Sequence, residues 1–187
     1  MREEADYIYD KVKEHHKWFS NSLPMIASEN IISPMAREML LSDFQDRYAE
    51  GIPGDRYYQG LKYVDDVELK VQELARNLFG VDYADVRPIS GTNANQAVLM
   101  ALGGPDKSIT SVDVSDGAHI SSAKFGSVGM RGMEPKTYPF NVDEMNIDVE
   151  GTRKLLKEEE PDIALFGRSV FLFPPPLPVG DLGGKEL

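Results

Sequence analysis

The residues with the clearest capacity for chemistry lie in one loop, residues 47–60, here called the Glu50 loop. Its sequence, RYAEGIPGDRYYQG, places Glu50 among arginines and tyrosines, with glycines and a proline between them. A carboxylate in such a loop can act as a general acid or base, while phenol groups orient a substrate or a phosphate. A solvated tyrosine-rich turn or a contact between subunits would use the same residue types, because glycines permit close approach of another surface. The residue types alone leave both interpretations open.

A second candidate is the turn Ser90-Gly91-Thr92, which precedes a helical pattern. At a helix start it can present two hydroxyls and free backbone N–H groups to a phosphate, helped by the positive end of the helix dipole. An ordinary capped helix is the alternative interpretation. The patterns GxxxxGK[ST] and GxGxxG of other phosphate-binding loops are absent from the sequence.

The chain has three histidines. His15 and His16 are adjacent on a polar helical segment, so their side chains diverge by about 100° and are expected to be solvated. His119 follows a predicted strand, where its ring could be held over a ligand at the strand's carboxyl end, although a structural role is the commoner one for a single histidine. No metal-binding spacing such as HExxH is present, and we expect no metal site.

These candidates need elements to position them, and the hydrophobic periodicity predicts an alternation of helices and strands. A helix is expected over residues 2–19, and another from Ser33-Pro34 through Leu40. Further helices are expected over 64–79, after the Ser90 turn and over 149–158, with strands at 83–86, 108–112 and 163–166. This order is typical of α/β folds. Three glycines are expected to loosen a loop: Gly126, Gly129 and Gly132.

The composition excludes several classes of protein. A chain of 187 residues with 41% hydrophobic and 27% charged residues is compatible with a globular domain. Its net charge of −11 argues against nucleic acid as a general partner. There is no cysteine, so disulfides and thiol nucleophiles are excluded. The sequence contains no secretory signal and no membrane-spanning apolar run, and we expect no membrane association and a cytoplasmic location.

Five motifs, in order along residues 20–173, resemble serine hydroxymethyltransferases, and the resemblance is to archaeal-like members. They are LPMIASEN from Leu23, YAEGIPGDRYYQG from Tyr48, Tyr63-Val64-Asp65, LFGVDYADVRPISGTNANQAV from Leu78, and Gly167-Arg168-Ser169. The resemblance implies an α/β, aspartate-aminotransferase-like fold, the large domain of fold type I pyridoxal-phosphate enzymes, with a mostly parallel sheet flanked by helices. It implies reversible transfer of a hydroxymethyl group between serine and a tetrahydropterin, either tetrahydrofolate or tetrahydromethanopterin, giving glycine. It also implies pyridoxal 5'-phosphate as cofactor and a homodimer.

By the same resemblance, Ser90, Gly91 and Thr92 hold the cofactor phosphate, His119 stacks on the pyridine ring, and Ser169 approaches the phenolic oxygen of the cofactor. Pyridoxal phosphate is itself the electron sink, so the protein must anchor and orient it.

The Glu50 loop would supply the acid–base group of the reaction, with Glu50 and His119 as the catalytic residues. Tyr48, also expected to contact the cofactor, and Tyr58 would reach a site in the partner subunit, and Ser28 would meet the substrate carboxylate. The resemblance implies these substrate-binding residues: Ser28, Glu50, Tyr58, Ala118 and Ile120.

The resemblance divides the chain into an N-terminal helical arm (1–45), part of the cofactor-binding large domain (46–173) and a proline- and glycine-rich tail of uncertain origin (174–187). In the family, the lysine that holds the cofactor, an aspartate at the pyridine nitrogen and an arginine for the substrate carboxylate come later in the sequence. We therefore expect a truncated large domain that does not hold the cofactor covalently and is inactive alone. A non-enzymatic dimerisation or binding fragment, or another fold type I pyridoxal-phosphate enzyme, remain the alternatives.

Overall fold

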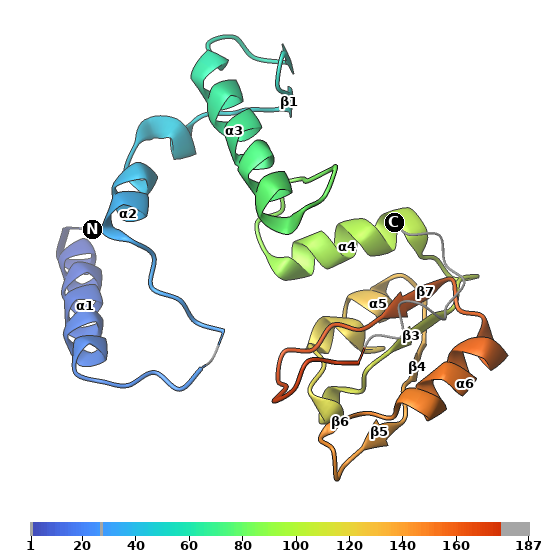
Figure 1. The fold of residues 1–187 in the computed structure, drawn as a ribbon. Coiled ribbons are helices and arrows are strands. Elements are labelled where there is room, and N and C mark those ends of the chain that lie inside the picture. Colours follow the sequence, from blue (N-terminus) through green and yellow to red (C-terminus); the bar gives the residue numbers. More distant parts are fainter. Residues whose placement is uncertain (1, 27, 177–187) are drawn as a thin grey trace. The chain divides into compact units, whose positions relative to one another are not determined.

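A computed structural model describes residues 2–26 and 28–176 (Figure 1). Most of the predicted tail, residues 177–187, lies outside the described residues. The contacts divide the chain into two compact units, of which the first ends at Asp65 and the second begins at Asp66. Each unit is described by itself.

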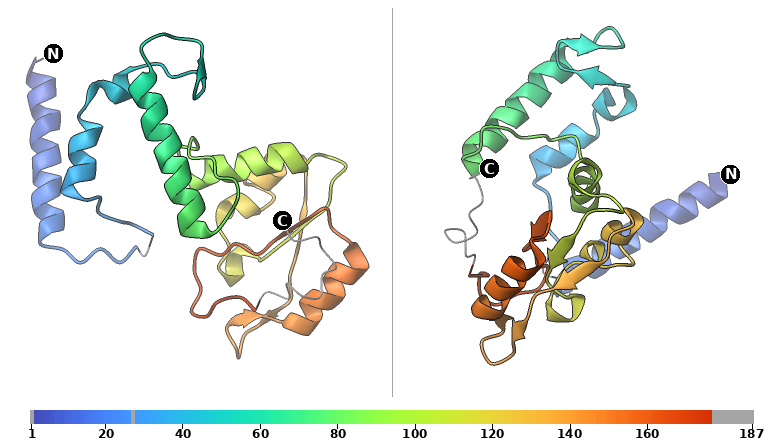
Figure 2. Two further views of the ribbon diagram at one scale, coloured as in Figure 1. Left: turned by 45° about the horizontal axis from the view of Figure 1, so that its top comes forward. Right: turned by 90° about the vertical axis from the view of Figure 1, so that its right-hand side faces the viewer.

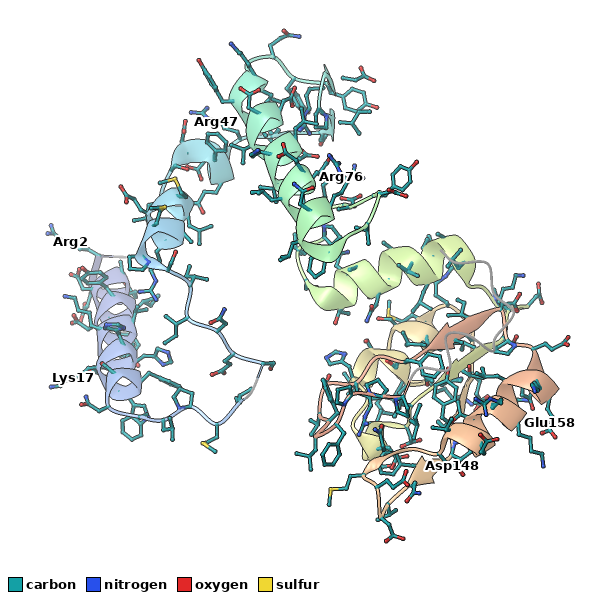
Figure 3. The ribbon with its side chains drawn as sticks, in the orientation of Figure 1. Arg2, Lys17, Arg47, Arg76, Asp148 and Glu158 are labelled. Carbon is teal, nitrogen blue, oxygen red and sulfur yellow. The ribbon has the colours of Figure 1, made fainter. Side chains whose placement is uncertain are left out.

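The first unit is mainly helical. Its elements are α1 (Arg2–Ser20), α2 (Pro34–Leu40), the 3₁₀ helix η1 (Asp43–Asp46), the two-residue strands β1 (Gly51–Ile52) and β2 (Asp55–Arg56), and the first turn of α3 (Lys62–Phe79). Figure 3 labels Arg2 and Lys17 near the two ends of α1, and Arg47 directly after η1. The predicted start of α2 is confirmed, because the Ser33 hydroxyl accepts a hydrogen bond from the Ala36 N–H at 3.2 Å.

The apolar stripes of the long helices are exposed. The described residues of α1, α2 and α3 include none that is buried. In α1, Trp18 is 73% exposed, and in α3, Leu78 is 78% exposed. Exposed apolar surface of this extent is typical of interaction sites.

The second unit is built on a small parallel sheet. Its strands lie in the order β4 (Pro135–Thr137), β3 (Ile109–Ser111), β7 (Ile163–Leu165), and β3 pairs in parallel with both neighbours. The helices are α4 (Gly91–Leu102), η2 (Val114–Asp116), η3 (Ile120–Ser122), α5 (Ser127–Met130) and α6 (Val149–Glu159), and β5 (Phe140–Asn141) pairs with β6 (Asn146–Ile147). The α/β class with a parallel sheet is thus confirmed.

Helices cover both faces of this sheet, and Figure 2 shows α6 on one side with α4 and α5 on the other. Because side chains alternate along a strand, Ile109 packs with Leu99 of α4 and Val128 of α5 on one face. On the opposite face, the hydroxyl of Thr110 lies 2.9 Å from the buried hydroxyl of Tyr138, within the layer covered by α6. Figure 3 labels Asp148 and Glu158 at the two ends of α6, where the Asp148 side chain accepts from the N–H of Gly151.

Two sequence expectations are wrong. Residues 83–86 form no strand, because they pair with no other strand of the described chain. Gly126 and Gly129 do not loosen a loop: an added Cβ would lie 2.2 Å from the Ile120 carbonyl oxygen at Gly126, and 1.5 Å from the Lys124 carbonyl oxygen at Gly129. These glycines permit close backbone packing at α5.

Among the residues that the structure describes, no helix is both long enough and apolar enough to cross a lipid bilayer.

Candidate functional site

The N-terminus of α4 offers hydrogen-bond donors and no acidic side chain. Ser90 is the N-cap, and its hydroxyl oxygen accepts from the Asn93 N–H at 3.0 Å, which leaves the hydroxyl proton of Ser90 available to a ligand. The backbone N–H groups of Gly91 and Thr92 occupy the first helical positions, where a helix provides no acceptor. The first turn contains no acidic residue, so the positive end of the helix dipole is not neutralised there. This arrangement fits an anion such as a phosphate group.

Hydrogen bonds connect α4 to the segment that carries His119. His119 is the N-cap of η3, and its Nδ1 accepts from the Ser121 N–H at 3.2 Å. The Ser121 hydroxyl lies 2.8 Å from the same nitrogen. That hydroxyl also accepts from the Asn95 side-chain amide of α4 at 3.3 Å. The His119 ring is therefore anchored one turn along the helix that begins with the Ser90 turn.

Ser169 is tied to the same segment. The N–H groups of Ser169 and Val170 both donate to the Gly117 carbonyl oxygen, at 2.8 and 3.0 Å. Gly117 has a φ of +100°, and a Cβ there would lie 2.1 Å from the Val170 carbonyl oxygen, so only glycine fits this turn. Because β3 and β7 are parallel, the segments that follow them leave the sheet at the same edge, the usual location of ligand sites in such sheets.

Two further predicted residues adjoin His119 in the sequence and differ in burial. Ala118 is 7% exposed and belongs to the core on the α6 side of the sheet, whereas Ile120 is 56% exposed. Of the two side chains, that of Ile120 is the one open to a ligand.

Charged groups near this edge include a carboxyl with a raised pKa. Burial raises the pKa of Asp116, and the nearby Asp113 carboxylate adds to the effect, while Arg168 opposes it. Hydrogen bonds from the Ser115 hydroxyl and N–H lower the pKa of Asp113. Asp113 thus retains its charge more readily than Asp116.

In the first unit, an ion pair clamps the Glu50 loop. One guanidinium nitrogen of Arg56 donates to the carbonyl oxygens of Ala49 and Gly51, the residues on either side of Glu50, at 2.6 and 2.9 Å. Another donates to Asp65 at 2.8 Å, and the Arg56 side chain is only 6% exposed. Hydrogen bonds from Arg56, and then from the Gly54 N–H, lower the pKa of Asp65. The backbone on both sides of Glu50 is held, while the Glu50 side chain is exposed.

Two tyrosines of the Glu50 loop lie together. The ring centroids of Tyr48 and Tyr58 are 5.7 Å apart, with a tilt of 33° between the rings. Both tyrosines line a cavity of about 520 Å³, together with Phe44, Arg47 and other neighbours. Ser28 is exposed and lies in the segment that joins α1 to α2.

The residues that hold Glu50 and His119 in place were not predicted from the sequence. They are Arg56 and Asp65 for the Glu50 loop, and Asn95 and Ser121 for His119. Only Ser121 had a local signal, because a serine two residues after a histidine can bond it through both the hydroxyl and the N–H. In the described part of the chain, no group of three or more His, Asp or Glu side chains could hold a metal ion.

Comparison with known proteins matches the sequence pattern of the serine hydroxymethyltransferase family to residues 1–173. The chain is 54% identical over 174 residues to the serine hydroxymethyltransferase of Picrophilus torridus, covering 93% of this chain and 40% of that protein. It is 50% identical to that of Pyrococcus furiosus and 48% identical to that of Nitrosopumilus maritimus, covering 94% of this chain and 41% and 42% of those proteins. The chain therefore spans about 40% of the length of the curated relatives it matches. With its family pattern matched from residue 1 to residue 173, this chain belongs to the serine hydroxymethyltransferase family.

Proposed function

We propose that this chain is part of a serine hydroxymethyltransferase, which transfers a hydroxymethyl group reversibly between serine and a tetrahydropterin and leaves glycine. The observation that carries the proposal is the N-terminus of α4, which offers hydrogen-bond donors without an acidic side chain and is linked through Asn95 and Ser121 to the His119 ring. Family membership supports the choice of reaction. The carrier is tetrahydrofolate or tetrahydromethanopterin, and the enzyme works in the cytoplasm.

The residues at this edge of the sheet fit pyridoxal 5'-phosphate, which when bound supplies an electron-withdrawing ring for bond cleavage at the amino-acid Cα. The hydroxyls of Ser90 and Thr92 and the N–H groups of Gly91 and Thr92 would hold the phosphate. The His119 ring would lie against the pyridine face, and the Ser169 hydroxyl would donate to the phenolic oxygen. These side chains are exposed or half-buried, and thus accessible to a ligand of this size.

In this mechanism Glu50 exchanges a proton with the oxygen of the substrate hydroxymethyl group. A carboxylate suits this role if its backbone is fixed while its side chain stays free to reach the substrate. The Arg56–Asp65 clamp meets the first condition, and the exposure of Glu50 meets the second.

Other residues of the chain would orient the substrate. Tyr48 and Tyr58 would enter the partner's site as the adjacent pair that their ring contact forms. Ser28 would donate to the substrate carboxylate. Ala118 and Ile120 would border the amino acid on the His119 side, and the exposed Ile120 would make the direct contact.

The proposed architecture is the large domain of a fold type I pyridoxal-phosphate enzyme, incomplete in this sequence, with residues 1–45 as an arm and 46–173 in the large domain. The exposed apolar stripes of α1 and α3 support a homodimer, because a dimer interface would remove them from water.

A chimera tests the function. Residues 1–173 would be joined to the remaining C-terminal part of the Picrophilus torridus relative, and glycine formation from serine measured with tetrahydrofolate and with tetrahydromethanopterin. We expect activity with pyridoxal phosphate and one of the carriers. The variant Glu50→Gln should lower kcat by about 100-fold or more, the usual contribution of a general acid–base group. As a matched control, Glu14→Gln on the exposed face of α1 should leave kcat unchanged. A folded chimera that binds the cofactor but forms no glycine from serine would refute the proposal.

The exposed apolar stripes also favour a second candidate function, a non-enzymatic dimerisation or binding module. Light scattering of this chain, combined with the chimera assay, separates the two. A stable dimer of this chain with an inactive chimera supports the binding module, whereas an active chimera supports the enzyme.

A further inference from the structure

Two groups of one residue contact the same ring nitrogen of His119. The Ser121 N–H donates to His119 Nδ1 at 3.2 Å, and Ser121 Oγ lies 2.8 Å from that atom. A backbone N–H can only donate, so Nδ1 must be the acceptor and carries no proton. The proton of a neutral imidazole then resides on Nε2.

The hydrogen bonds behind Ser121 run in the same direction. The Asn95 amide nitrogen donates to Ser121 Oγ at 3.3 Å, so the serine hydroxyl is free to point its own proton at His119 Nδ1. Ser121 is only 4% exposed, and little water competes for its hydroxyl. The donor order is therefore Asn95 to Ser121 to His119. The conclusion for Nδ1 does not depend on the orientation of the Asn95 amide, because the Ser121 N–H alone requires an acceptor there.

We propose that Ser121, supported by Asn95, is a positioning residue that fixes the His119 ring and holds it in the Nε2–H tautomer. A proton added at Nδ1 would face the Ser121 N–H and break that contact, and the Ser121 hydroxyl would have to turn its own proton away and accept instead. His119 thus donates through Nε2 and does not serve as a base through Nδ1. Its use as a neutral ring stacked on a cofactor rests on the function proposed above, whereas the tautomer is a property of this chain.

Nitrogen NMR of the 187-residue chain tests the assignment directly. With ¹⁵N-labelled histidine, long-range proton–nitrogen correlations report which ring nitrogen carries the proton in each of the three histidines. The measurement is made at about pH 8, where an ordinary imidazole with a pKa of about 6.5 is neutral. His15 and His16, both exposed on α1, serve as internal references. We expect a single tautomer at His119, with an unprotonated Nδ1, and a mixture at the two references.

Variants then test the role of the Ser121 side chain. Ser121→Ala keeps the backbone N–H but removes the hydroxyl, and should shift the tautomer ratio of His119 about fivefold toward the other form, as the loss of one typical net hydrogen bond predicts. Ser121→Thr retains a hydroxyl and should restore the wild-type ratio. Ser122→Ala is the matched control: Ser122 is equally buried at 5% exposure, and its N–H bonds the carbonyl of His119. It should leave the ratio unchanged.

The outcomes separate clearly. A proton on Nδ1 of His119, or a tautomer mixture like that of His15 and His16, overturns the proposal. So does an unchanged ratio in Ser121→Ala. If that variant does not fold, Asn95→Ala decides, because it removes only the outer hydrogen bond: a shifted ratio supports the relay and an unchanged one refutes it. An inactive chimera would refute the proposed function while leaving this NMR result intact, so the two failures are distinguishable.

Discussion

The substitution Gly117→Ala should detach the segment that carries Ser169 from the segment that carries His119. The new Cβ would lie 2.1 Å from the Val170 carbonyl oxygen, so the backbone must move. The movement pulls the Gly117 carbonyl away from the Ser169 and Val170 N–H groups, which donate to it at 2.8 and 3.0 Å.

Two contributions set the size of the effect. An alanine at a φ of +100° carries left-handed strain of roughly 1–2 kcal/mol. Each of the two backbone hydrogen bonds contributes about 1 kcal/mol net when made. The free energy of unfolding should therefore fall by roughly 3 to 4 kcal/mol, a large fraction of the 5–15 kcal/mol typical of domains.

Two other glycines separate these contributions. Gly80 has a φ of +64° with nothing within 4 Å of an added Cβ, so Gly80→Ala should cost only the left-handed strain, roughly 1–2 kcal/mol. Gly104 has open space and no positive φ, and Gly104→Ala should be nearly neutral.

Urea unfolding followed by far-UV circular dichroism gives the three free energies. Hydrogen exchange read by mass spectrometry reports the Ser169 and Val170 amides, which should exchange faster in Gly117→Ala alone. If Gly117→Ala loses no more stability than Gly80→Ala, and those two amides stay protected, the assigned close contact at Gly117 is wrong.

Three further predictions concern ionisable side chains. Burial raises the pKa of Tyr138 to about 12 from 10.0, so its stabilising contribution is present below pH 10 and is lost as the pH rises toward 12. Tyr138→Phe removes the hydrogen bond to Thr110 and should lower the free energy of unfolding at pH 7 by about 1–2 kcal/mol. Urea unfolding at a series of pH values should show this difference from wild type narrowing above pH 10. A difference that stays constant with pH would contradict the raised pKa of Tyr138. Hydrogen bonds from the Lys107 ammonium group and from the N–H and hydroxyl of Ser108 lower the pKa of Asp162 to about 2 from 3.8. The stabilising contribution of Asp162 is therefore present above pH 3.8 and is lost as the pH falls toward 2. The stability difference between wild type and Asp162→Asn should shrink over that interval, and a difference that grows instead argues against the ion pair. Arg56→Gln should speed amide exchange in the Glu50 loop because the clamp is lost, while Arg47→Gln, which breaks only an exposed ion pair, should change it little; equal effects would show that the clamp does not hold the loop.

Local patterns predicted the helices well. The 3.6-residue periodicity located α1, α3, α4 and α6, and each end that was predicted lies within two residues of the observed end. The start of α2 at Ser33-Pro34 followed from its capping residues alone. These signals work because a helix closes its hydrogen bonds within one segment, so its limits depend on neighbouring residues.

Strands were predicted less well. The strands at 108–112 and 163–166 are present as β3 and β7, but residues 83–86 form none, and β4 was not predicted. β4 has three residues and begins with Pro135, and it is a strand because it pairs in parallel with β3. Pairing of this kind joins segments that are distant in the sequence, and a local pattern contains no information about it.

By itself, the sequence determined the helices, the α/β class and the choice of Ser90, Glu50 and His119 as candidate site residues. It could do so because capping, periodicity and motif order are local properties. Tertiary structure alone decided which strands pair, why Gly117 admits no side chain, and which donors face His119 Nδ1. Asn95 and Ser121 lie 26 residues apart in the sequence, and only the folded chain brings them within hydrogen-bonding distance. Which group donates in such a pair depends on the burial of the two side chains and on how closely the fold brings them together. The spacing of residues in the sequence contains no information about either.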